Sequence, residues 1–387
     1  MPDKHLHIIS FSIPFPANYG GVIDVYYKLK ALHKAGIKIH LHCFKYDRET
    51  APELEKYCES VNYYQRNTGI ASQLSLIPYI VNSRQSTTLL AALMSDNHPI
   101  LFEGLHSCYY LNNKHLQNRN RIYRESNIEH HYYYNLAKAE KNVIRKLYFL
   151  LESARLFFYQ KNLRYADKML VVSQTDRDYL TNAFEGKSIV YLPSFHGNES
   201  VDIELETNSF ALYHGNLSVA ENVQAALYLI KEVFNNIPQK LVIAGLNPDL
   251  EIIQEVKKHS NIELVANPSQ DAMQKLVSEA QINILITFQP TGLKLKLLNT
   301  LYRGKHVIVN THMLSGTGLE KLCIIKDSVS EMQQAIAEYM QTDFDTRKVA
   351  QRKEILYNRY SDESNANALI REVFGNNKKS EATAKPS

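Results

Sequence analysis

The fold is decided by residues 6–44, LHIISFSIPFPANYGGVIDVYYKLKALHKAGIKIHLHCF, which contain a strand, a loop, a helix and a second strand in succession. The apolar run His7–Ser12 predicts the first strand, and the prolines and glycines after it are typical of a loop. Apolar residues then recur at helical spacing over Val22–His33, and Gly36 ends the helix. Because Ile37–Phe44 has the pattern of another strand, the stretch predicts a βαβ unit and a parallel sheet.

The same alternation of strands and helices continues through most of the 387 residues. Further strands are expected at Pro99–Phe102, Arg121–Arg124, Lys168–Val172, Phe210–His214, Lys240–Ala244, Ile262–Val265, Ile282–Ile286 and His306–Val309. A helix is expected over Glu221–Asn235, where the apolar spacing repeats that of the first helix. These elements predict an α/β protein with two Rossmann-like domains in tandem, divided near Leu192–Val201, where turn residues cluster. Residues 375–387, rich in Asn, Lys, Ser and Ala, are expected to form a disordered tail.

The charge balance excludes some functions. The chain has 44 basic and 40 acidic residues, and a net charge of +4 is too small for a dedicated nucleic-acid binder, so we expect no nucleic-acid partner. Residues 1–194 hold 24 basic and 17 acidic residues, a net charge of +7, whereas the remainder has a net charge of −3. This asymmetry suggests two lobes with different partners.

Targeting signals and cysteine motifs are not found. The four cysteines lack CxxC spacing, so they predict neither a disulfide framework nor a zinc site, in keeping with a reducing cytoplasm. The first apolar stretch is too short for a signal peptide. No window approaches 18 charge-free apolar residues, so no transmembrane helix is expected. We expect a cytoplasmic protein.

Two segments have the features of an anion site. Gly20 and Gly21 lie between a strand and a helix, where backbone N–H groups and the helix dipole attract anions; equally, these glycines serve the turn alone. Lys294 and Lys296 lie near the start of a helix that follows the strand Ile282–Ile286. The dipole disfavours cations at a helix start, and a bound diphosphate would remove that penalty.

Polar side chains also follow two strands of the first domain. Glu103 and His106 come after the strand Pro99–Phe102 and suit a base or an orienting pair, although a structural histidine explains the spacing equally well. The charged stretch Arg124–His130 follows the next strand. It predicts either a site or a solvated loop that leads into a helix.

The stretch 138–168 combines eight basic and three acidic residues with many aromatic and aliphatic ones. A basic, aromatic-rich helix is a candidate for contact with an anionic membrane surface. Core packing would account for its apolar residues equally well. Both interpretations stay open at this point.

Four segments carry a family resemblance, namely Phe15–Gly36, Val171–Leu180, Tyr213–Leu227 and Thr291–Val309. Together, and in this order, they resemble retaining GT-B glycosyltransferases of the family 4 type, over nearly the whole chain. The resemblance implies two Rossmann-like domains facing a central cleft, with residues 1–194 on the acceptor side and 195–360 binding a nucleotide sugar. It also implies that a C-terminal helix, 361–374, crosses back onto the first domain.

The resemblance further implies transfer of a hexose from a nucleotide sugar to a glycan or lipid-linked saccharide, with retention and without a metal or another cofactor. Donor binding falls to Gly20, Gly21, Gly215, Asn216, Gly292, Lys294, Lys296 and Asn299. Catalytic roles fall to His106, Glu129 and Lys296. Acceptor binding falls to Glu103, Arg124 and Asn127. An acceptor linked to lipid would suit an enzyme at the inner face of the cytoplasmic membrane.

The sequence also departs from the family pattern. Asn299 occupies a place where relatives usually have glutamate, paired with an acid at the place of Thr291. Ser126 stands where histidine is frequent, and Asn222 stands near the place of a common basic residue. A catalytically degenerate GT-B protein that binds a glycan or a partner is therefore an alternative, and a sugar-nucleotide epimerase or hydrolase is another.

Overall fold

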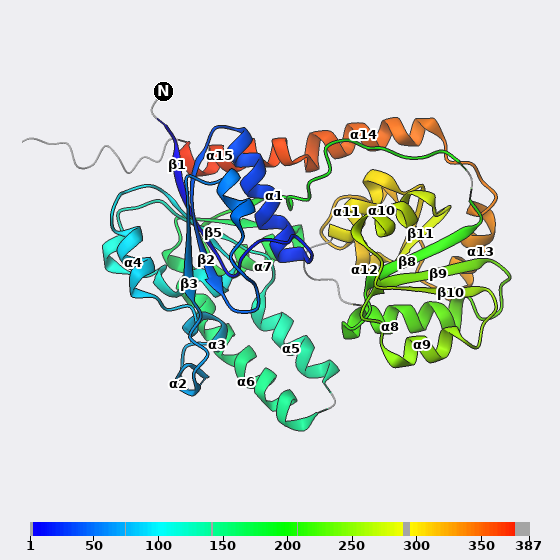
Figure 1. Ribbon diagram of the computed structural model, residues 1–387, viewed down its shortest axis with the longest axis horizontal. Helices are drawn as coiled ribbons and strands as arrows, with labels where there is room; N and C mark the ends of the chain where they lie inside the picture. The colour runs from blue at the N-terminus through cyan, green and yellow to red at the C-terminus, as the bar shows by residue number, and fades with distance from the viewer. Residues whose placement is uncertain (1–2, 74, 141, 207, 289–294, 376–387) are drawn as a thin grey trace, which may run out of the picture. The chain divides into compact units, whose positions relative to one another are not determined.

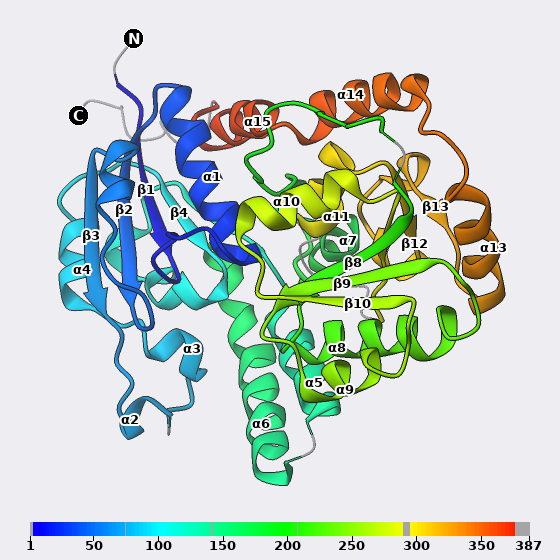
Figure 2. The same cartoon turned by 45° about the vertical axis from the view of Figure 1, so that its right-hand side comes forward.

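The computed structural model describes residues 3–73, 75–140, 142–206, 208–288 and 295–375. The chain divides into two compact units. Unit 1 is Met1–Gly197 with Tyr360–Ser387, and unit 2 is Asn198–Arg359. Each unit has one parallel sheet with helices on both faces (Figures 1 and 2). Thr291, Gly292, Lys294 and the predicted tail beyond Gly375 lie outside the described residues.

Unit 1 contains a seven-stranded parallel sheet in the order β3-β2-β1-β4-β5-β6-β7 within the described ranges. Its strands are β1 His5–Ser10, β2 Lys38–Lys45, β3 Ser60–Gln65, β4 Ile100–Glu103, β5 Arg121–Arg124, β6 Lys168–Val171 and β7 Ser188–Tyr191. The order reverses direction at β1, so β1 and β4 are neighbours although a long segment separates them in the chain. In doubly wound sheets, ligands bind at the carboxyl ends of the strands at such a point.

The helices of unit 1 cover both faces of its sheet. They are α1 Gly20–Lys34, α2 Ile70–Gln73, α3 Tyr79–Asn82, α4 Thr87–Leu93, α5 Glu129–Ala139, α6 Val143–Tyr159, α7 Gln174–Ala183 and α15 Asp362–Phe374. On one face, Leu29 of α1 and Leu369 of α15 share a core. On the other face, Val81, Leu93 and Leu180 pack in a second core. The expected return of the C-terminal helix to the first domain is confirmed, because Lys168 of β6 holds Glu372 of α15 at 2.8 Å.

Unit 2 contains a six-stranded parallel sheet in the order β10-β9-β8-β11-β12-β13 within the described ranges. Its strands are β8 Phe210–Asn216, β9 Lys240–Leu246, β10 Ile262–Ala266, β11 Ile282–Leu285, β12 His306–Val309 and β13 Ile324–Ile325. Its helices are α8 Ala220–Tyr228, α9 Leu250–Val256, α10 Gln270–Glu279, α11 Leu295–Arg303, α12 Thr311–Leu314, α13 Val329–Tyr339 and α14 Thr346–Tyr360. Ala226, Ile252 and Ile336 bring α8, α9 and α13 onto one face, and Val277 of α10 packs on the other.

The two-domain α/β prediction is confirmed, but several elements differ from expectation. The helix expected over Glu221–Asn235 ends as an α-helix at Tyr228 and continues as one π turn, Leu229–Val233. The short strands β3, β7 and β13 were not predicted. Each lies at or near a sheet edge, where exposed positions take polar residues and the apolar signal is weak. Among the described residues, no helix has the length and apolar character needed to cross a bilayer.

Candidate functional site

The carboxyl ends of the strands in unit 1 bring several predicted site residues together. Ligands of open α/β sheets bind at this edge because the loops after the strands meet there. The loop after β1 leads into α1, and the residues after β4 and β5 include His106 and Asn127. This edge is therefore the candidate ligand site of unit 1.

Gly20 and Gly21 are the first two residues of α1 rather than part of the loop before it. Tyr19 precedes them in an extended conformation, and its side chain does not cap the helix. A Cβ at Gly21 would lie 2.7 Å from Cζ of Phe11, so a larger residue would displace that ring. The N–H groups of this first turn lie at the positive end of the helix dipole, which suits an anion.

His106 and Glu129 lie side by side, with 3.7 Å between His106 Nδ1 and Glu129 Oε1. That separation is too long for a hydrogen bond, and the buried Nδ1 atom has no hydrogen-bond partner among the described residues. Burial raises the pKa of Glu129 to about 8, against the opposing effect of Arg84. Burial, reinforced by Arg84 and Arg66, lowers the pKa of His106 well below its usual value. Near neutral pH the pair is a protonated carboxyl beside a neutral imidazole, which can donate to and accept from a hydroxyl group.

Arg84 belongs to this site although sequence reasoning missed it. It lies between α3 and α4, is only 6% exposed, and donates from Nε to the carbonyl oxygen of Phe11 at 2.8 Å. The Phe11 ring in turn packs against His106, with 5.5 Å between centroids. Burial lowers the pKa of Arg84 to about 9, so the guanidinium is still charged at neutral pH. The only hint in the sequence was a charged residue placed shortly after the apolar pair Ile80 and Val81.

Glu103 and Arg124, predicted to bind the acceptor, are parts of a buried charge cluster. Lys28 of α1 donates to Glu103 at 2.6 Å and to Asp24 at 2.9 Å. Arg124 contacts Asp24 at 3.4 Å and donates to the carbonyl oxygen of Pro193 at 3.0 Å. All four side chains are at most 3% exposed, and their contacts join α1 to the end of the first domain, so the acceptor-binding role of Glu103 and Arg124 stays a prediction. Burial raises the pKa of Glu103 despite the attraction of Lys28.

Asn127, the third predicted acceptor residue, is half-buried in the turn between β5 and α5. Its backbone N–H donates to Glu125 Oε1 at 3.0 Å, and that of Ser126 donates to the same oxygen at 3.1 Å. Glu125 is itself buried, and Tyr123 donates to its other oxygen at 2.7 Å. The hydrogen bonds to the buried Glu125 thus fix the conformation of this turn. The role of Asn127 in acceptor binding stays a prediction.

A shallow depression of about 550 Å³ lies at the loops after β1 and β2. Its lining includes Phe15, Asn18 and Arg48, and none of the predicted site residues. Its open shape and its mixed charges at Asp47, Arg48 and Glu49 give no specific chemistry. The contacts around His106 therefore define the candidate site better than this depression does.

In unit 2, the candidate site lies where β8 ends and α8 begins. Lys296 of α11 donates from Nζ to Asn222 Oδ1 at 3.2 Å. The same ammonium lies over the ring of Tyr213, 5.3 Å from the centroid. Asn222 also donates from Nδ2 to the carbonyl oxygen of Asn216 at 3.0 Å, so its side chain joins the lysine to the turn. The neutral Asn222 thus orients Lys296 at the start of α8.

Gly215 and Asn216 are the last two residues of β8, just before the turn that leads into α8. A Cβ at Gly245 of β9 would lie 1.8 Å from the carbonyl oxygen of Gly215, so the close approach of β8 and β9 requires glycine at position 245. The Asn216 side chain accepts hydrogen bonds from the backbone and hydroxyl of Ser218, which shapes the turn into α8. Asn216 therefore acts through its backbone and its turn geometry, and its side chain is engaged locally.

The remaining predicted donor residues have different fates. Asn299 of α11 accepts a hydrogen bond from Asn198 Nδ2 at 2.7 Å, so its amide is already partnered within unit 2. Gly292 and Lys294 lie outside the described residues. Thr300, the residue after Asn299 in α11, is hydrogen-bonded to His214 at 3.2 Å. Burial, and then Lys296, lower the pKa of His214 to about 3, so this ring is neutral.

Segment 138–168 is not a single helix: α5 and α6 form an antiparallel pair that extends from the sheet of unit 1 (Figures 1 and 2). In α6 only Glu152 and Leu156 are fully buried. Val143, Ile144 and Leu147 are 76%, 81% and 68% exposed. Core packing therefore does not account for the apolar residues at the tip of this pair.

No family model matches the chain. An uncharacterized 44.6 kDa protein in the cps region of Klebsiella pneumoniae is 27% identical over 379 residues, covering 92% of this chain and 94% of that protein. Among solved structures, TarM of S. aureus superposes with a TM-score of 0.69 at 10% identity, over 96% of this chain and 99% of TarM. Anabaena Alr3699/HepE superposes with a TM-score of 0.61 at 12% identity, over 95% and 99%.

The chain adopts the GT-B fold. The likeness extends over both units of this chain and over nearly the full length of each solved structure. At such low identity, the likeness shows only that the backbone fold is shared. It assigns no role to any residue. Function has to be argued from the side chains at the two carboxyl edges.

Proposed function

We propose that the protein is a retaining glycosyltransferase of the family 4 type, which transfers a hexose from a nucleotide sugar to a glycan or a lipid-linked saccharide. The observation that carries the proposal is Lys296, held by Asn222 and Tyr213 above the turn at the end of β8. The GT-B fold supports it, as do the solved structures of HepE with UDP and glucose and of a TarM mutant with UDP. The Klebsiella relative from the cps region suggests polysaccharide biosynthesis as the context.

The donor diphosphate is expected to bind in unit 2, at Gly215 and Asn216, which end β8, and at the start of α8. Lys296 would neutralise the phosphate that leaves, together with Lys294 and the backbone of Gly292. Asn299 would contact the ribose as a neutral hydrogen-bond partner. In the reaction, the bond from the sugar C1 to the diphosphate oxygen breaks and the bond to the acceptor oxygen forms on the same face. The acceptor's proton passes to the departing diphosphate, whose growing charge Lys296 stabilises.

The acceptor is expected to bind in unit 1. The half-buried ring of His106 would hydrogen-bond a sugar hydroxyl, and the carboxyl of Glu129 beside it would help to position that ring. Arg84 supplies the positive charge that suits a phosphate-bearing acceptor. None of these steps uses a metal, so turnover is expected to survive chelation.

The exposed tip of the α5–α6 pair would bring the enzyme to a lipid-linked acceptor at the inner face of the cytoplasmic membrane. Apolar side chains at the tip, such as Ile144 and Leu147, alternate with the cations of Arg145 and Lys146. This combination suits insertion among anionic headgroups.

The test is turnover of the full chain with a panel of nucleotide sugars, UDP-glucose and UDP-N-acetylglucosamine first, with and without saccharide acceptors. Transfer that requires the acceptor and retains the anomeric configuration is the expected result. Binding without turnover would favour the degenerate binding module instead. Release of free sugar without an acceptor would indicate a hydrolase, and interconversion of the donor would indicate an epimerase.

A further inference from the structure

Five histidines gather at the amino-terminal edge of the sheet in unit 1, opposite to the candidate ligand edge. His5 and His7 alternate along β1, as His40 and His42 do along β2, so each pair points to one face of the sheet. The register pairs His7 with His40 and places all four on the same face. His98 joins them from the loop just before β4.

The two inner histidines are fully engaged. His7 is hydrogen-bonded to Asp96 at 2.9 Å and to His42 at 2.8 Å, and His42 is hydrogen-bonded to Tyr64 at 2.8 Å. Both rings are buried, at 3% and 1% exposure. Their hydrogen bonds therefore hold His7 and His42 in place next to the other three histidines, His5, His40 and His98.

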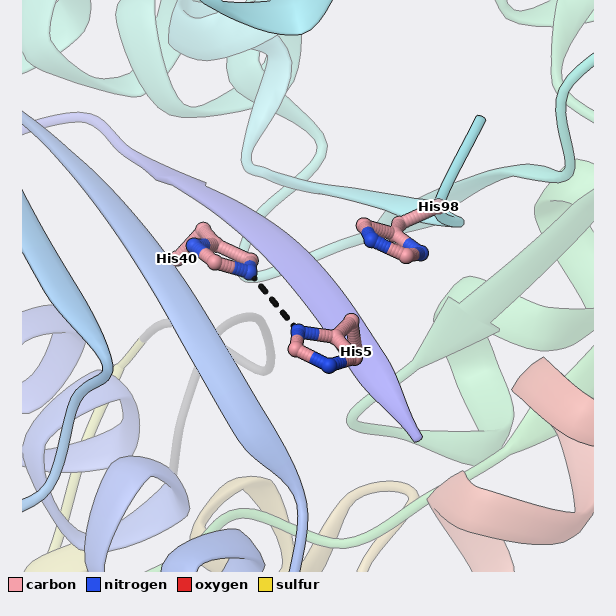
Figure 3. Close-up of side chains that lie close together, drawn as sticks. All are labelled: His5, His40 and His98. Atoms are coloured by element: carbon pink, nitrogen blue, oxygen red, sulfur yellow. Dashed lines mark hydrogen bonds between the residues drawn. The ribbon is translucent and has the colours of Figure 1, made fainter. Parts of the chain in front are cut away.

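The three outer histidines, His5, His40 and His98, are half-buried at the surface and turn toward one another (Figure 3). His5 Nδ1 and His40 Nε2 lie 3.0 Å apart. The His98 ring stacks on that of His5 with centroids 4.6 Å apart. One nitrogen from each ring lies within 4.8 Å of the other two.

Neighbouring residues leave the ring nitrogens of the three outer histidines in an arrangement that suits a cation. Ser60 of β3 lies 3.0 Å from His40 Nδ1 and so directs Nε2 toward His5, as outer-shell partners do for metal ligands. Within the described residues, no hydrogen bond joins the ring nitrogens of His98 to protein. Arg119, the nearest guanidinium, is occupied by Asp96 at 3.1 Å.

The distances suit a borderline divalent cation after a small adjustment. Nitrogens that share a tetrahedral zinc ion with bonds of about 2.0–2.1 Å lie about 3.3 Å apart. The His5–His40 separation is already close to that value, and turning the His98 side chain in its loop would bring its nitrogen within reach. We propose that His5, His40 and His98 form a binding site for a divalent cation of the Zn²⁺ class, with water at the fourth position. The ion would fasten β1, β2 and the loop before β4 together.

The test is calorimetric titration of the chelator-treated full chain with Zn²⁺, supported by the visible spectrum of the Co²⁺ form. One equivalent is expected to bind. His98→Ala should weaken binding by more than about 100-fold, since a ligand matters more than an outer-shell partner, and Ser60→Ala should weaken it by about 10–100-fold. His115→Ala, which removes an exposed histidine elsewhere in unit 1, is the matched control and should leave the affinity unchanged.

The proposal is overturned if the wild type binds no zinc, or if His98→Ala and Ser60→Ala both bind it as tightly as the wild type does. Because His98 lies in a loop and Ser60 is conservatively changed, at least one variant should keep its circular dichroism spectrum and report on the site. Neither outcome depends on nucleotide-sugar turnover, so the result is independent of the proposed function.

Discussion

The charged side chains at the two carboxyl edges of this molecule have different surroundings. In unit 1, Lys28 and Arg124 are buried against Asp24 and Glu103, and the charges neutralise one another inside the protein. In unit 2, Lys296 donates to the amide oxygen of Asn222 and lies over the ring of Tyr213. A fully buried cluster of ion pairs serves the fold, whereas we propose that Lys296 serves the diphosphate.

The comparison predicts that a lysine of unit 1 matters mainly to stability. Lys28→Met should leave Asp24 and Glu103 without their shared cation and lower the free energy of unfolding by about 3–5 kcal/mol. Urea unfolding of the full chain measures it. Lys34→Met, an exposed position on the same helix, is the control and should change little. Equal stability of both variants would show that the cluster does not hold unit 1 together.

Lys296→Ala should have the converse effect, on activity rather than on stability. Removing one group that stabilises the departing diphosphate is expected to lower kcat by about 10²–10³-fold, or about 2.7–4 kcal/mol in the barrier. The free energy of unfolding without ligand should hold steady. Steady-state kinetics beside urea unfolding measure both, with the exposed Lys257→Ala as control. If Lys296→Ala loses stability but keeps its kcat, Lys296 serves the fold, as Lys28 is expected to do in unit 1.

Glu129 offers a way to sharpen the comparison with pH. Its pKa in the folded state is raised from 4.5 to about 8, so the folded protein binds this proton more tightly than the unfolded chain does. Stability that this proton confers is present below pH 4.5 and lost as the pH rises to about 8. Relative to Glu129→Gln, the wild type should therefore lose unfolding free energy over this window, at up to about 1.4 kcal/mol per pH unit. A difference that does not vary with pH would mean that Glu129 is ionised in the folded protein.

The smallest predicted effect concerns the tip of the α5–α6 pair. Replacing Arg145 and Lys146 with serine should weaken binding to anionic vesicles by about 1 kcal/mol for each residue, an effect that fades at high salt. Co-sedimentation at low and high salt measures it. The exposed Lys114→Ser in unit 1 is the control. If the wild type ignores anionic and neutral vesicles alike, the exposed apolar side chains serve some other contact.

Much of the fold could be predicted because its signals are local. Residues 6–44 show both the strand-like and the helix-like spacing of apolar residues. The structure differs there from the prediction only by small shifts, such as β1 at His5–Ser10 rather than His7–Ser12. The two residues of β13 are too few for a period to show. Segment 138–168 is interpreted from its sequence as one helix because its basic and apolar residues continue past one start signal, Asn142, whose side chain caps α6 by accepting a hydrogen bond from the N–H of Arg145.

Candidate site residues could be proposed from the sequence where they follow a strand closely, as His106 and Glu129 do, or lie near a helix start, as Lys296 does. Arg84 enters from a coil between two short helices, and the contact of Asn222 with Lys296 joins residues 74 positions apart. The burial of Glu103 and Arg124 depends on Lys28 of α1, which lies 75 positions before Glu103. The histidine cluster escaped notice for the same reason, since only the strand register brings His5 beside His40.

The most direct test of the central claim is a calorimetric titration of UDP into the full-length wild type, Lys296→Ala and Lys257→Ala. The wild type and Lys257→Ala are expected to bind UDP with equal affinity, whereas Lys296→Ala should bind it much more weakly while staying folded. Unchanged UDP affinity in Lys296→Ala would contradict the proposed donor site, because the diphosphate would then bind away from Lys296.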